Sequence, residues 1–86
     1  MFKVHNIETD GNEQTFESSG TCRELIFGIQ GADLEIGDES GEDTFTIEDG
    51  DHLDLTGYDL RNTTFYLTAS SSGETIEIIE MTGPRF

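Results

Sequence analysis

The chain has 86 residues, of which 33% are hydrophobic and none is tryptophan, so it is long enough for a single domain, residues 1–86, with a thin core. Its 19 acidic residues against four lysines and arginines give a formal net charge of −15, which argues against nucleic-acid binding because that needs clustered cations. The single cysteine, Cys22, excludes an intramolecular disulfide. No apolar run approaches the roughly 20 residues of a membrane span, and the first residues lack the pattern of a signal peptide, so we expect a soluble protein.

Alternation of apolar and polar residues predicts short β-strands along the whole chain, separated by turns that contain glycine. The expected strands are residues 2–8, 13–18, 22–29, 32–37, 44–48, 52–56, 63–69 and 74–82. The stretch 22–29 is the most apolar, and we expect it to be buried on both faces. A short helix beginning at Arg23 is the alternative there.

The same alternation predicts which side chains face the interior. We expect the following residues to point inward: Leu34, Ile36, Phe45, Ile47, Leu53, Leu55, Leu60, Phe65, Leu67, Ile76, Ile78 and Met81. Asp49-Gly50 and the Ser70–Gly73 loop are each expected to close a β-hairpin, while residues 57–62 form an arch between two strands. The pattern is typical of an all-β domain, a small antiparallel β-sandwich or barrel of seven to eight short strands, and a jelly-roll-like arrangement is among the options.

Several acidic residues could supply oxygen ligands for calcium: Asp38, Glu42, Asp43, Asp49 and Asp51. Their spacing does not match an EF-hand loop, so we predict an acidic turn instead. His5 and His52 have no further histidine or cysteine at ligand spacing, which favours surface or half-buried histidines over a zinc site. Cys22 is interpreted as a small, partly buried apolar residue. We therefore expect no metal and no cofactor.

Two tyrosines could belong to a carbohydrate site, because stacking aromatic rings beside polar groups bind sugars. Tyr58 and Tyr66 lie near Asp54, Asp59 and Asn62, but the pattern favours Tyr66 on an exposed strand face and Tyr58 at the arch. No catalytic motif is present: acidic residues are too abundant for any pair to be informative, and a cupin-like enzyme would need clustered histidines. We predict that the protein is not an enzyme.

The C-terminal two thirds has a distinctive order of short motifs. They are Ala32-Asp33-Leu34-Glu35-Ile36-Gly37, Thr44-Phe45-Thr46-Ile47, Gly50-Asp51-His52-Leu53-Asp54-Leu55, Tyr58-Asp59-Leu60, Thr64-Phe65-Tyr66-Leu67-Thr68-Ala69 and Gly73-Glu74-Thr75-Ile76-Glu77-Ile78. Over residues 32–82 this order resembles small all-β structural proteins of tailed bacterial and archaeal viruses. The resemblance implies a capsid decoration (cement) protein on the surface of a virion, made in the host cytoplasm, with the major capsid protein and copies of itself as partners.

Three further expectations accompany this resemblance. Local three-fold positions are common decoration sites, which implies a trimer. The termini place a cation beside an aromatic residue, so Phe2, Lys3, Arg85 and Phe86 are the candidate interface residues. Abundant acidic residues with a single lysine resemble proteins of salt-loving organisms, so we expect a halophilic host. The alternatives are a tail or vertex protein of a virion, or a carbohydrate- or calcium-binding β-sandwich module.

The charge balance generates the first testable prediction. Because the net charge of −15 opposes folding by self-repulsion, added salt should stabilise the protein. We expect the melting temperature, followed by circular dichroism, to rise as salt increases from about 0.05 M to about 3 M. A melting temperature that stays constant over this range would contradict the halophilic interpretation.

Overall fold

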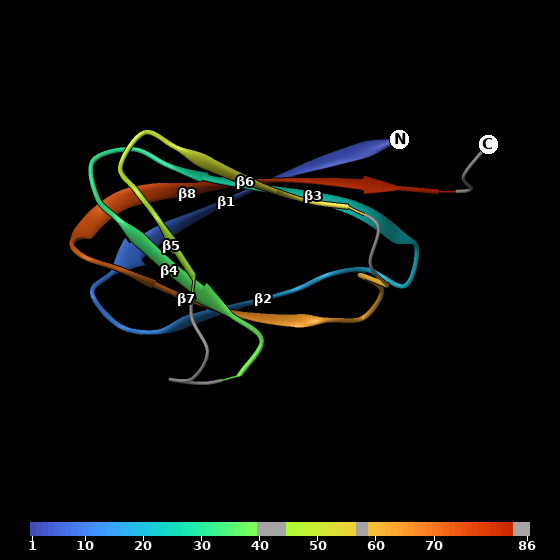
Figure 1. Cartoon of the computed structure of the whole chain (residues 1–86), viewed down its shortest axis with the longest axis horizontal. Coiled ribbons are helices and arrows are strands. Elements are labelled where there is room, and N and C mark those ends of the chain that lie inside the picture. Colours follow the sequence, from blue (N-terminus) through green and yellow to red (C-terminus); the bar gives the residue numbers. More distant parts are fainter. Residues whose placement is uncertain (40–44, 57–58, 84–86) are drawn as a thin grey trace.

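The computed structural model describes residues 1–39, 45–56 and 59–83, and these form eight β-strands in two layers (Figure 1). The strands are β1 (Phe2–Asp10), β2 (Gln14–Glu17), β3 (Cys22–Ile29), β4 (Leu34–Gly37), β5 (Phe45–Ile47), β6 (His52–Leu55), β7 (Thr64–Ala69) and β8 (Ser72–Thr82). One sheet has the order β1-β8-β3-β6 and the other β2-β7-β4-β5. The predicted all-β class and antiparallel sandwich are therefore confirmed. In the described part of the chain, no helix is long and apolar enough to cross a membrane.

The strands pair as the two halves of one long antiparallel ribbon. β1 pairs with β8, β2 with β7, β3 with β6, and β4 with β5. Phe2 lies opposite Met81 and Leu34 lies opposite Ile47, so the numbers of paired residues add up to nearly the same total along the ribbon. Successive pairs alternate between the two sheets, which brings β8 beside β3 and β7 beside β4. A ribbon wound in this way is a jelly roll.

The core consists of the inward-facing row of each strand, because successive side chains of a strand point to opposite faces of its sheet. The buried apolar residues are Phe16, Cys22, Leu25, Phe27, Ile29, Ala32, Leu34, Ile36, Ile47, Leu60, Phe65, Leu67, Ala69, Ile76 and Ile78. Leu53 and Leu55 of the edge strand β6 are partly buried against them. Most of the residues predicted to point inward are confirmed by this arrangement.

A row of rings links the two sheets through the interior. The ring centroids of His5 and Phe16 are 4.9 Å apart, those of Phe16 and Phe27 are 6.2 Å apart, and those of Phe27 and Phe65 are 5.2 Å apart. Because β1 and β3 belong to one sheet and β2 and β7 to the other, each contact crosses the interface. These tilted and edge-on ring contacts add to the burial that holds the sheets together.

Two residues predicted to point inward are not part of the core. Phe45 lies on the inward face, because it pairs with Ile36 and precedes Ile47 by two residues, but it is 58% exposed at the start of the short edge strand β5. Met81 lies on the outer face of its sheet, and Glu80 takes the inward position instead. In β8 the strict alternation Ile76, Ile78, Glu80 holds, so an apolar side chain is placed outside and a carboxylate inside.

Both predicted hairpins are also wrong. β5 and β6 lie in different sheets, as do β7 and β8, so each of these turns carries the chain across the sandwich. At the first turn Gly50 adopts a φ of 86°, which favours glycine, and the Asp51 N–H donates to the Glu48 carbonyl oxygen at 2.9 Å. A tight turn is thus present where expected, but it leads the chain into the other sheet instead of pairing β5 with β6.

Strand 22–29 is confirmed, and the helical alternative is wrong. Its expected burial on both faces is wrong: Cys22, Leu25, Phe27 and Ile29 are buried, whereas the opposite face is only half-buried. None of the described strands forms a third layer over that face. The apolar residues of this stretch therefore lie partly in the core and partly on the outer face of the sheet.

Replacing Phe65 with alanine tests the core assignment. Phe65 is 6% exposed and contacts Phe27, so the loss of the ring should leave a cavity and cost about 3–5 kcal/mol in the free energy of unfolding. The matched control is Thr64→Ala on the half-buried opposite face of β7, which should cost less than about 1 kcal/mol. Denaturant unfolding in high salt measures both. Equal losses for the two variants would contradict the assigned faces.

Candidate interaction surface

A buried carboxylate, Glu80, lies at one end of the interior. It is 2% exposed on the inward row of β8. Its Oε1 lies 3.1 Å from His5 Nε2, and its Oε2 accepts a hydrogen bond from the Ser19 backbone N–H at 2.7 Å. Both partners are far from Glu80 along the chain, and the wound ribbon brings them to it. A buried charge requires such partners, because an unpaired carboxylate would be costly in this position.

Burial by itself raises the pKa of the Glu80 carboxyl, but the hydrogen bonds from Ser19 and His5 outweigh it, so this pKa lies below its ordinary value of 4.5. Burial and the neighbouring Glu80 carboxylate raise the pKa of the Cys22 thiol to about 11. A thiol with a raised pKa is a poor nucleophile, since the thiolate is the reactive form. The contacts of Glu80 therefore connect β1, β8 and the segment before β3 at this end of the sandwich.

The outer face of the β1-β8-β3-β6 sheet carries a second cluster, made of apolar side chains. The register places Phe2 beside Met81, and it aligns Val4, Ile79 and Ile26 in a row across three strands. Phe2 is 65% exposed and Val4 is 55% exposed, while the other three are half-buried. We call these five residues the outer apolar patch. We take this patch as the candidate interaction surface, because the packing of the interior does not require apolar side chains there.

Beside the outer apolar patch lies a shallow hollow of about 220 Å³. The next row across the sheet runs from Asn6 through Glu77 and Gly28 to His52, and Gly28 leaves a gap because it has no side chain. Ile26, Ile79, Asp51, His52 and Glu77 are among the residues that line the gap. The hollow therefore has apolar walls on the side of the patch and carboxylates on the other.

The acidic residues considered for calcium do not assemble into a site within the described ranges. Asp49 accepts a hydrogen bond from the Gly31 N–H at 2.7 Å, and its own N–H donates to Asp33 at 2.9 Å, so these carboxylates brace a turn. Glu42 and Asp43 lie outside the described residues. Among residues 1–39, 45–56 and 59–83, no group of three histidines, cysteines or acidic residues is arranged to hold a metal ion. His5 contacts Glu80 inside, and His52 lies on the outer face.

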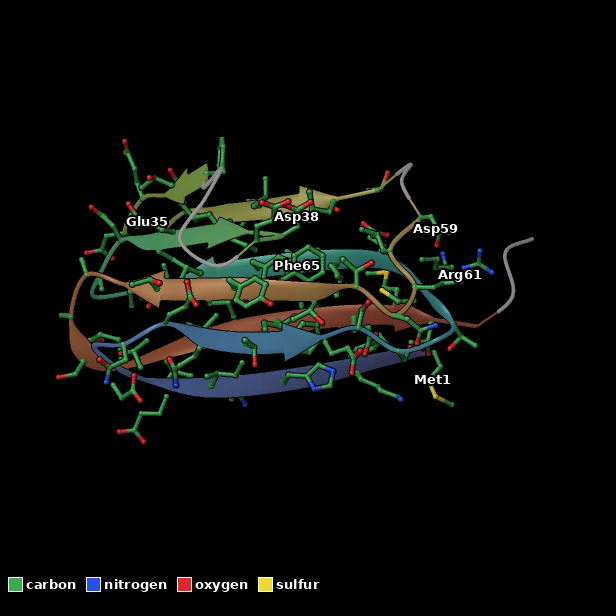
Figure 2. All side chains as sticks on the ribbon, turned by 90° about the horizontal axis from the view of Figure 1, so that it is seen from below. Met1, Glu35, Asp38, Asp59, Arg61 and Phe65 are labelled. Atoms are coloured by element: carbon green, nitrogen blue, oxygen red, sulfur yellow. The ribbon has the colours of Figure 1, made fainter. Side chains whose placement is uncertain are left out.

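The residues considered for a carbohydrate site are dispersed. Tyr58 lies outside the described residues, and Tyr66 is half-buried on β7, in the other sheet from Asp54. Asp59 is engaged by Arg61, whose guanidinium donates two hydrogen bonds at 2.9 and 3.0 Å and holds the pKa of that carboxyl at about 2 (Figure 2). The described part of the proposed site thus has no aromatic platform beside free polar groups.

Of the four terminal residues predicted to contact a partner, the structure describes two, Phe2 and Lys3. Phe2 belongs to the outer apolar patch. Lys3 is exposed and alternates with Phe2 and Val4, so the pattern of β1 assigns it to the opposite face. Arg85 and Phe86 lie outside the described residues. Sequence reasoning missed Val4, Ile26, Gly28, Ile79 and Met81, although the apolar excess of 22–29 and 74–82 was a signal that these strands carry more apolar residues than one face needs.

Comparison with models of protein families, with curated proteins and with solved structures found no match to this chain. Any functional conclusion therefore depends on the surfaces described above.

Removing the charge of Glu80 should make stability less sensitive to acid. The folded-state pKa is lowered, so the stabilisation by the ionised carboxylate is present above the ordinary value of 4.5 and is lost as pH falls toward the folded-state pKa. Glu80→Gln should cost about 1–3 kcal/mol near pH 7, and the difference from wild type should shrink as pH falls to about 3. Urea unfolding at several pH values measures this difference.

The matched control is Glu77→Gln, which changes the same type of residue on the exposed face of the same strand. It should leave the free energy of unfolding nearly unchanged across the pH range. A pH-independent difference for Glu80→Gln would mean that the lost contacts, and not the charge, explain its cost.

Proposed function

We propose that this chain is a non-enzymatic structural protein of a virus particle, a decoration (cement) protein that binds the outer surface of the capsid of a tailed virus with a halophilic host. The observation that carries the proposal is the outer apolar patch on a protein that is otherwise strongly acidic. Its partners would be the major capsid protein and neighbouring copies of itself, in a trimer. Its work would be to bridge capsid subunits by contact area and not by chemistry.

The composition of the two kinds of surface supports this proposal. Interface centres are depleted in Asp and Glu and enriched in aromatic residues and methionine. The outer apolar patch has this composition, with Phe2 and Met81 side by side. The acidic remainder suits a surface that faces salt water, because hydrated carboxylates keep a crowded particle surface soluble.

The fold is compatible with the proposal but does not carry it. Jelly rolls occur in viral capsid proteins, in lectins and in cupins, so the strand order alone does not distinguish among these functions. A carbohydrate- or calcium-binding module and a tail or vertex protein of the virion remain the competing proposals. A carbohydrate- or calcium-binding module does not need an apolar sheet face, whereas a protein that attaches to other virion proteins buries apolar side chains in that contact, so the patch favours a virion protein over a binding module but does not separate the capsid from the tail or vertex.

The proposal is tested with capsids of the virus whose genome encodes the chain. Shells stripped of minor proteins are incubated with the purified protein in high salt and separated on a density gradient. We expect the protein to move with the shells, and the temperature at which the shells disrupt to rise. Serum albumin, another acidic protein, serves as the control for trapping. Protein that stays at the top of the gradient with unaltered shell stability would contradict the proposed function.

A further inference from the structure

The outer apolar patch continues directly into the hollow above Gly28. The row Val4, Ile79 and Ile26 lies next to the row that contains Glu77, Gly28 and His52. A partner that covers the patch therefore also covers the hollow. The two features are best treated as a single docking surface.

The charges around this surface indicate which kind of partner fits it. At the paired outer-face positions of these four strands, Glu8, Glu24, Glu77 and Asp54 are carboxylates, and none of these positions holds a lysine or arginine; a cation, Arg23, lies beside them at the β-bulge of β3. Packing this face against the same face of a second copy would bring carboxylates together on chains that each carry a net charge of −15. A cationic partner would instead find complementary charge beside the apolar contacts.

The hollow has the properties of a receptor for one cationic side chain. Glu77 and Asp51 lie at its wall, so a cation there would have carboxylates within reach. Ile26 and Ile79 form the apolar side, against which the methylene groups of a long side chain can pack. A planar guanidinium suits such a site better than an ammonium, because it is weakly hydrated and binds carboxylates through a rigid pair of donors.

We propose that the outer face of the β1-β8-β3-β6 sheet docks a protein segment that presents apolar side chains to the outer apolar patch and inserts an arginine into the hollow above Gly28. The proposal deepens the proposed function and rests on it for the identity of the partner, which would be the capsid subunit. The chemistry of the docking surface can be tested without a capsid.

Gly28 provides a sharp probe of the hollow. A Cβ added there would lie 3.7 Å from the Asp51 carbonyl oxygen and 3.8 Å from the Cβ of His52, which are ordinary contact distances. Gly28→Ala should therefore fold normally, and Gly28→Val should fill more of the hollow with a residue that favours strands. Circular dichroism and thermal melting establish that each variant is folded before binding is measured.

The first arm uses short capped peptides of alternating valine and threonine with one central arginine, titrated into the ¹⁵N-labelled protein and followed by NMR. We expect amide shifts at Gly28, His52, Glu77 and Ile79. Affinity should fall by about tenfold when the arginine of the peptide is replaced with glutamate. It should also fall stepwise in Gly28→Ala and Gly28→Val.

Charge and patch variants complete this arm. Val4→Lys and Glu77→Lys should each weaken binding of the arginine peptide by at least about tenfold. The matched control is Glu35→Lys, an exposed position on the outward-facing row of the other sheet (Figure 2), which should leave the affinity unchanged. Shifts that appear elsewhere on the protein, or equal affinity for the arginine and glutamate peptides, would overturn the proposed docking surface.

The second arm repeats the shell-binding experiment with Val4→Lys, Gly28→Val and Glu35→Lys. Loss of binding in the first two variants but not in the third supports the docking surface on the capsid. If the wild type and all three variants bind shells equally, the docking surface is wrong although the proposed function stands. If the arginine peptide binds as expected but wild type does not bind shells, the docking surface stands and the proposed function fails.

Discussion

Burial of one row of side chains per strand between the two sheets is the constraint on which the rest of the structure depends. A chain with so few hydrophobic residues can fill only one thin interior, and the ribbon winding places the inward rows of β3, β4, β7 and β8 at its centre. Because alternate residues of a strand point to opposite faces, this interior leaves the outer rows unconstrained by packing. The composition of the outer rows is then open to selection for solubility or for binding.

The two outer faces use this freedom differently. On β4 the outward residue Glu35 pairs with Thr46 and Thr68, and the row across that sheet is polar. On the opposite sheet the corresponding positions include Val4, Ile26 and Ile79. Apolar side chains that are exposed to water do not stabilise the isolated fold. On a chain whose surface is otherwise strongly acidic, they differ sharply from their surroundings. This asymmetry between sheets is the strongest indication of function in the molecule.

Glu80 illustrates a second consequence of the winding. A carboxylate at an inward position is unfavourable unless hydrogen-bond donors reach it, and here they come from His5 on β1 and from Ser19 before β3. The same end of the sandwich holds Ser18, whose hydroxyl donates to the Leu60 carbonyl and accepts from the Thr63 N–H at 2.9 Å. These bonds join residues 60–63, which precede β7, to the connection between β2 and β3. Polar contacts thus help to close this end of the core, beside the buried side chains of Cys22 and Leu60.

The sequence by itself determined the strands and most of the interior. Period-two alternation is a local property, so Phe65 and Leu67, or Ile76 and Ile78, could be assigned to one face without knowing their neighbours. Only the tertiary structure decided which strands lie together, because the turns at Gly50 and at residues 70–71 permit either a hairpin or a crossing between sheets. The alternation of β8 already puts Glu80 on the row of Ile76 and Ile78, but only the tertiary structure supplied the partners His5 and Ser19, distant in sequence, that make a carboxylate tolerable there. The outer apolar patch and the hollow above Gly28 belong to the same category: their residues come from strands far apart along the chain, and only pairing in register makes them neighbours.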